Sequence, residues 1–87
     1  MVLFTCPSDN LLRREAGRVT ARALALGLDR SCSVADGARL LGEEPGPALH
    51  AALRRVESAA ADERSPQGRA AAMLRVALRS RVTRPAA

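Results

Sequence analysis

Apolar residues recur at intervals of three and four positions along most of this chain, which is the spacing of one face of a helix. The first stripe follows three good N-cap residues at positions 8–10 and consists of Leu12, Ala16, Val19, Ala23 and Leu26. Gly27 and Asp29 mark its end. The pattern therefore predicts a helix over residues 9–27.

Three further helices are predicted from their start and stop signals. Ser33 with Asp36 three residues later resembles a capping box and predicts a helix over residues 33–41. The prolines and glycine of "EEPGP" interrupt the pattern, because residues before proline are pushed out of the helical region. Pro47 and the pair Ser65-Pro66 are then start signals, and they predict helices over residues 47–64 and 66–82.

No stretch of the chain alternates apolar and polar residues as a strand would, and β-branched and aromatic residues are scarce. The sequence therefore predicts an all-α fold, a small bundle of four helices in a single domain over residues 1–87. Residues 1–7 and 83–87 are expected to be flexible ends. Only a few residues separate the last two helices, which predicts that they form an antiparallel hairpin.

The predicted core is lean. The chain has 87 residues, Phe4 is its only aromatic residue, and alanine is abundant. Each alanine in place of a leucine gives up roughly 2 kcal/mol of apolar burial. We therefore expect the protein to self-associate or to hold a permanent protein partner.

The net charge is +5, and all fourteen basic residues are arginine. Residues 33–64 carry four arginines against six acidic residues, whereas residues 65–87 carry five arginines and no acidic residue. These five are predicted to contact an acidic surface: Arg69, Arg75, Arg79, Arg81 and Arg84. On the first helix Arg14, Arg18 and Arg22 lie one turn apart, and we interpret them as a solvated helix face.

The apolar stripes of the last two helices are the predicted docking surface for a partner helix or a second copy of the chain. Their residues are Leu49, Leu53, Val56, Met73, Leu74 and Leu78. Together with the basic C-terminal segment, they indicate a non-enzymatic interaction, adaptor or regulatory protein.

A second interpretation rests on residues 33–42, "SVADGARLLG". They resemble the first helix and turn of bacterial helix-turn-helix regulators, in which a small residue, an apolar pair and a glycine mark a tight corner. The resemblance covers residues 33–56 and implies a DNA-binding transcriptional regulator that contacts DNA through His50, Arg54 and Arg55. Glu43 departs from the pattern, because an apolar residue usually follows the glycine.

Residues suited to catalysis or metal binding are few. His50 is the only histidine, no tyrosine or tryptophan is present, and Cys6, Cys32 and His50 do not have the close spacing of metal ligands. We expect no enzyme activity, no cofactor, no metal and no small-molecule substrate. No apolar run is long enough to cross a membrane and the N-terminus lacks the basic region of a secretion signal, so we expect a cytoplasmic protein with reduced thiols.

Overall fold

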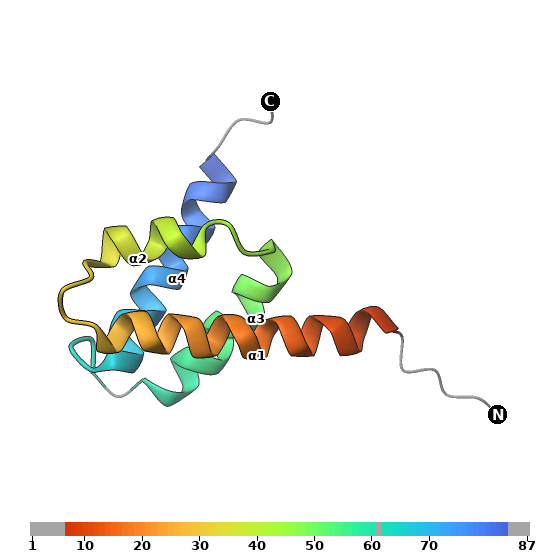
Figure 1. Ribbon diagram of the computed structural model, residues 1–87, viewed down its shortest axis with the longest axis horizontal. Helices are drawn as coiled ribbons and strands as arrows, with labels where there is room; N and C mark the ends of the chain where they lie inside the picture. Colours follow the sequence, from red (N-terminus) through yellow and green to blue (C-terminus); the bar gives the residue numbers. More distant parts are fainter. Residues whose placement is uncertain (1–6, 61, 84–87) are drawn as a thin grey trace.

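The computed structural model describes residues 7–60 and 62–83. Its four helices are α1 (Pro7–Leu28), α2 (Val34–Leu41), α3 (Gly46–Ala59) and α4 (Pro66–Thr83) (Figure 1). No strand occurs within these described residues. The prediction of a small all-α bundle of four helices is confirmed.

The ends of the chain differ in part from the sequence expectation. Most residues of the predicted flexible ends lie outside the described residues. Pro7 and Thr83 are exceptions, because α1 begins at Pro7 and α4 ends at Thr83. A proline is well suited to the first turn of a helix, where no intrahelical partner is needed for a backbone N–H.

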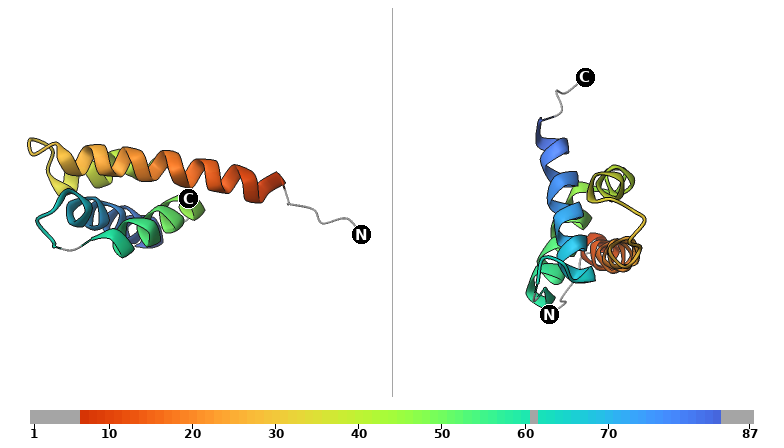
Figure 2. Two further views of the ribbon diagram at one scale, coloured as in Figure 1. Left: turned by 90° about the horizontal axis from the view of Figure 1, so that it is seen from below. Right: turned by 90° about the vertical axis from the view of Figure 1, so that its left-hand side faces the viewer.

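The four helices form a flat molecule that measures 51 × 35 × 16 Å along its principal axes. α1 runs along the longest axis, and α3 and α4 both pack against it. α2 packs mainly on α4 and more lightly on α1. Viewed from below, α1 lies on one side of α3 and α4, and its first turns extend past the rest of the bundle (Figure 2).

α3 and α4 form the predicted antiparallel hairpin. Next to the connecting turn, Gly68 of α4 packs against the backbone of Asp62 and Glu63. Farther along, Arg75 of α4 pairs with Glu57 of α3. At the other end, Arg81 of α4 lies beside Gly46, the first residue of α3. The beginning of each helix therefore lies beside the end of the other.

The end of α3 is a correction to the sequence analysis. The helix ends at Ala59 and not at residue 64, because Ala60 is extended (φ −77°, ψ 120°). The following residues form a turn in which the backbone N–H and the hydroxyl of Ser65 both donate to the carbonyl oxygen of Asp62, at 3.1 and 2.6 Å. This turn reverses the chain for α4, and a helix continued to residue 64 would leave no room for it.

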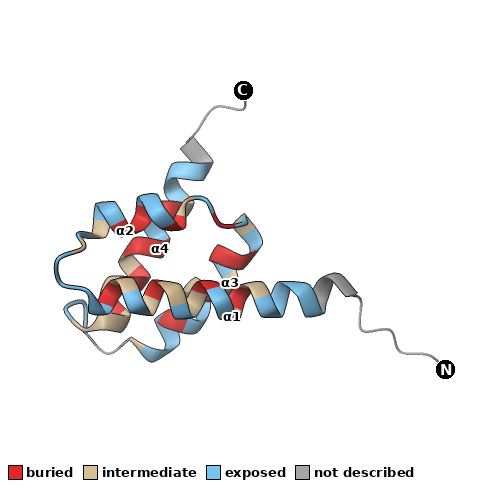
Figure 3. Cartoon of the chain, in the orientation of Figure 1, coloured by how far each residue is buried: buried red, intermediate tan, exposed pale blue. Residues whose placement is uncertain are grey.

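One hydrophobic core connects all four helices (Figure 3). Its largest fully buried side chains are Val19, Leu41, Leu49, Val56, Met73 and Leu74. Most of the other buried apolar residues are alanines. Small side chains let the helices approach closely: a Cβ atom on Gly27 of α1 would lie 2.3 Å from the carbonyl oxygen of Pro66 in α4.

Candidate partner-binding site

The apolar residues predicted to bind a partner lie in or against the chain's own core. Leu49, Val56, Met73 and Leu74 are buried, and Leu53 and Leu78 are half-buried and pack against the same core. The chain's own core therefore accounts for these apolar stripes, and their role in binding a partner stays a prediction. The apolar stripes are real, but α1 and α2 already cover them within one chain.

Arg69, one of the five predicted basic contact residues, holds the fold together. Its guanidinium donates to the carbonyl oxygens of Gly27 at 3.0 Å and Asp29 at 3.3 Å, and also to that of Cys32. These carbonyls belong to the end of α1 and to the loop that follows, where intrahelical donors run out. Arg69 is therefore a clamp between α4 and the α1–α2 loop.

The other basic residues of this set have different surroundings. Arg75 pairs with Glu57 at 2.9 Å across the hairpin. Arg79 and Arg81 are exposed on the last turns of α4, and Arg84 lies outside the described residues. Arg69 and Arg75, which were predicted to contact a partner, thus make contacts within the chain's own fold.

A groove of about 510 Å³ runs between α2 and the C-terminal half of α4, beside the contact between the two helices. Three small side chains line it, Ala35 and Ala38 from α2 and Ala77 from α4. Val76, which is half-buried, adds an apolar side chain from α4. Small apolar side chains leave room for larger ones that enter from outside, so the groove can accept an amphipathic helix.

Charged side chains from both helices also line this groove. Arg39 comes from α2 and Arg81 from α4, and both are exposed. Glu43, in the loop after α2, is the acidic residue of the lining. Two arginines from facing helices favour a partner that carries carboxylates beside its apolar face.

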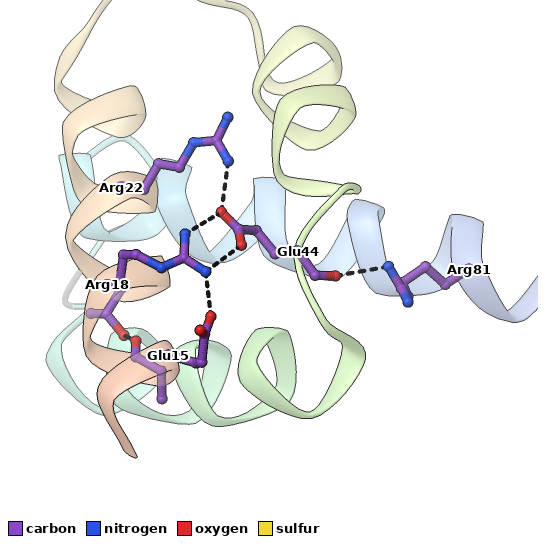
Figure 4. A network of polar contacts seen from close by, with 7 residues as sticks. Glu15, Arg18, Arg22, Glu44 and Arg81 are labelled. Atoms are coloured by element: carbon purple, nitrogen blue, oxygen red, sulfur yellow. Dashed lines mark hydrogen bonds and ion pairs between the residues drawn. The ribbon is translucent and has the colours of Figure 1, made fainter. Parts of the chain in front are cut away.

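The loop at one end of the groove is fixed by Glu44 (Figure 4). Its side chain is 7% exposed. The carboxylate accepts hydrogen bonds from both terminal nitrogens of the Arg18 guanidinium, at 2.7 and 2.8 Å, and a third hydrogen bond from Arg22 at 2.6 Å. Its carbonyl oxygen accepts from Arg81 at 2.8 Å. Arg18 also pairs with Glu15. The loop between α2 and α3 is thereby tied to α1 and to α4.

The arginines and carboxylates of this network stabilise one another's charged forms. Hydrogen bonds from Arg18, and secondarily from Arg22, lower the pKa of Glu44 although burial opposes the shift. The same contacts raise the pKa of Arg18 above its ordinary value. Glu44 is therefore ionised at neutral pH and holds the loop as a charged group.

Neither Glu44 nor the groove was predicted from the sequence. The signal for the network was present, since Arg18 and Arg22 lie one turn apart on the flank of the first apolar stripe. We interpreted them as a solvated face, and both are in fact paired with a buried carboxylate. Their partner lies 26 and 22 residues away, so spacing alone does not reveal it.

No protein-family model matches this sequence, and no curated protein or solved structure is significantly similar to it.

The three residues of the DNA-binding alternative, His50, Arg54 and Arg55, are exposed on α3. In a helix-turn-helix, the two helices of the motif pack against each other at a steep angle. Here α2 packs on α4 and scarcely touches α3. The DNA-reading motif stays a prediction, and its two helices do not form the packed pair that is typical of it.

The described part of the chain contains no group of three histidine, cysteine, aspartate or glutamate side chains that could hold a metal ion. None of the described helices is both long and apolar enough to cross a bilayer. Cys32 is half-buried with a free thiol, and Cys6 lies outside the described residues.

Proposed function

We propose that this protein is a non-enzymatic adaptor that binds an amphipathic helix of a protein partner in the groove between α2 and α4. The observation that carries the proposal is the groove itself, which combines small apolar side chains with Arg39 and Arg81 on its two helices. Binding of a helix in a groove is a common mode of peptide recognition. The partner helix presents an apolar face toward Ala35 and Val76, the more exposed apolar residues of the lining, and carboxylates toward the arginines.

Charge supports an acidic partner over a second copy of this chain. Residues 65–87 carry five arginines and no acidic residue, so α4 of a second copy would bring further positive charge to the groove. Like charges that face each other across an interface cost binding free energy. The same charges steer an acidic partner toward the groove and make its association sensitive to salt.

The proposal is tested with a fluorescent 18-residue synthetic peptide that has leucines at helical spacing and glutamates beside them. Anisotropy titrations are expected to show binding, and a matched peptide with lysine for glutamate is expected not to bind. Arg39→Glu should weaken binding of the acidic peptide by about tenfold or more, equivalent to about 1.4 kcal/mol. Ala35→Trp, which fills the groove without a change in charge, should also weaken it.

Arg64→Glu is the matched control, because Arg64 is exposed in the α3–α4 turn and lies outside the groove. It makes the same change in net charge and should leave the affinity within about twofold. Equal losses for Arg39→Glu and Arg64→Glu would show attraction by net charge only. A dimer in sedimentation that Ala35→Trp dissociates would show that a second copy occupies the groove. Either outcome overturns the proposal.

A further inference from the structure

Four exposed arginines lie on α1 and α3, which pack against each other and are not the two helices that form the groove. Arg54 and Arg55 lie on α3, and Arg13 and Arg14 lie on α1. The Nη1 atom of Arg55 lies 3.6 Å from the point that a Cβ atom on Gly17 would occupy, so this side chain reaches across to α1. We call these four residues the α1–α3 basic cluster.

The position of Gly17 brings the Arg55 side chain beside Arg13 and Arg14. Arg13 and Arg14 precede Gly17 by four and three residues, and residues at these spacings are neighbours on a helix surface, about 5–6 Å apart at Cβ. The guanidinium of Arg55 therefore lies beside the part of α1 from which Arg13 and Arg14 project. Figure 2 shows α3 running beneath α1 at this crossing.

No ion pair involves any of these four arginines in the part of the chain that the structure describes. Other arginines are used within the fold: Arg18 and Arg22 bind Glu44, and Arg75 binds Glu57. Glu15, which follows Arg14 directly, is engaged with Arg18. Within the described residues, the cluster is thus a positive surface whose arginines form no ion pair, and such a surface attracts polyanions.

The chemistry of the cluster favours a phosphodiester backbone over an acidic protein. Protein interfaces depend on a few large apolar or aromatic anchors in desolvated pockets. The exposed α3 residues Ser58 and Ala59 near the cluster are small, and the large apolar side chains beside it are the exposed Leu11 and Leu12 of α1. Guanidinium groups bind phosphate oxygens in bidentate fashion, and phosphate contacts alone suffice for binding that does not depend on base sequence.

We propose that the α1–α3 basic cluster binds the phosphate backbone of a nucleic acid without reading its sequence. This inference does not depend on the proposed function, because the two surfaces lie on different pairs of helices. It also differs from the helix-turn-helix hypothesis, since it requires no contact with bases and draws two of its four residues from α1.

The full chain is titrated by anisotropy into three probes of mixed sequence: a 20-base-pair DNA duplex, the corresponding RNA duplex and a single DNA strand. Four phosphate contacts predict that log K falls with log salt concentration with a slope of about −3.6 for duplex DNA. Between 50 and 200 mM salt, affinity should therefore fall by about 100-fold or slightly more. Binding of both duplexes supports a general backbone contact, and binding of only one identifies the natural class.

Removal of single charges tests the location. Arg13→Gln, Arg54→Gln and Arg55→Gln should each reduce the steepness of the salt dependence by about one unit. Arg30→Gln and Arg64→Gln are the controls, because both residues are exposed in loops away from the α1–α3 crossing and lose the same charge. They should leave the slope unchanged. Circular dichroism confirms that all five variants keep the helical content of the parent.

Three results would overturn the inference. Equal effects of cluster and control substitutions would mean attraction by overall charge. Poly-glutamate of matched length that competes as well as duplex DNA would indicate an acidic protein surface as the partner. Affinities that differ by more than about tenfold between duplexes of unrelated sequence would indicate base reading.

Discussion

At the scale of single residues, Glu44 is the charged side chain that the described part of the chain buries, and two arginines of α1 balance its charge. We expect Glu44→Gln to lower the free energy of unfolding by roughly 2 kcal/mol, as for loss of hydrogen bonds to a charged group. Urea denaturation at neutral pH measures this change. Glu43→Gln alters the exposed neighbour and should change stability by less than about 0.5 kcal/mol.

The pH dependence of the stability difference between the parent chain and Glu44→Gln tests whether the ionised carboxylate causes that difference. The pKa of Glu44 is lower in the folded chain than in the unfolded chain, where it is about 4.3. Its contribution is therefore complete above that value and is lost as the pH falls through the folded pKa. The stability gap between the parent and Glu44→Gln should close in acid. A gap that stays constant down to the acid transition would contradict the role of the charge.

The sequence could indicate the two arginine donors of this network but not the carboxylate that accepts their hydrogen bonds. Arg18 and Arg22 have the one-turn spacing that places two guanidinium groups on one flank of a helix. Which carboxylate meets them depends on how the loop between α2 and α3 folds back on α1. Glu43 and Glu44 are adjacent and chemically alike, yet one is exposed and the other buried. Only the path of the backbone distinguishes them.

At the scale of secondary-structure elements, α1 can pack closely on α4 because Gly27 has no side chain. A Cβ atom on Gly27 would lie 2.3 Å from the carbonyl oxygen of Pro66 and 3.2 Å from the nitrogen of Ala70. Both are backbone atoms, so Gly27→Ala should force the helices apart and cost about 1–3 kcal/mol of stability. Thermal unfolding followed by circular dichroism measures the change.

Gly17 provides the matched control within α1. A Cβ atom there would meet only the end of the Arg55 side chain, at 3.6 Å, which is an ordinary contact distance. Alanine is the better helix former, so Gly17→Ala should raise stability by about 0.5–1 kcal/mol. If both substitutions stabilise the chain, α1 and α4 do not approach each other closely at Gly27.

Helix positions were largely predictable from local chemistry, whereas contacts between helices were not. Ser33 caps α2 as predicted, since the backbone N–H of Asp36 donates to its hydroxyl at 3.1 Å. Ser65 likewise accepts from the N–H of Gly68 at the start of α4. The early end of α3 was missed because Asp62 and Ser65 form a turn with each other, and both residue types are also compatible with a helix end one turn later.

At the scale of the whole molecule, periodicity reveals that a helix face is apolar but not what covers it. The stripes of α3 and α4 were expected to bind a partner, and in the structure Leu49 and Met73 lie in the chain's own core. Four helices of this length can cover one another's stripes within a single chain. One opening that remains is the α2–α4 groove, which depends on tertiary packing and has no signature in the sequence.

The molecule is flat, and much of its core consists of alanine, so the isolated chain should be only marginally stable. We expect a low melting temperature that rises when the acidic helical peptide occupies the groove. At a free peptide concentration 100 times the Kd, linkage adds about 2.7 kcal/mol. For a domain of this size that corresponds to about 10–20 °C. Scanning calorimetry with and without the peptide measures the shift.

The charge-reversed peptide is the control for that shift and should leave the melting temperature unchanged. The dependence of the melting temperature on protein concentration distinguishes stabilisation by a second copy of the chain from stabilisation by a separate partner helix. If a second copy supplied the missing contacts, the melting temperature of the chain alone would rise over a hundredfold range of concentration, because association stabilises by mass action. Binding of a separate partner helix predicts a melting temperature that is independent of protein concentration without peptide. A monomer with a high melting temperature would contradict the prediction of a marginally stable core. A melting temperature that the acidic peptide does not change would contradict the proposal that the groove binds a partner helix.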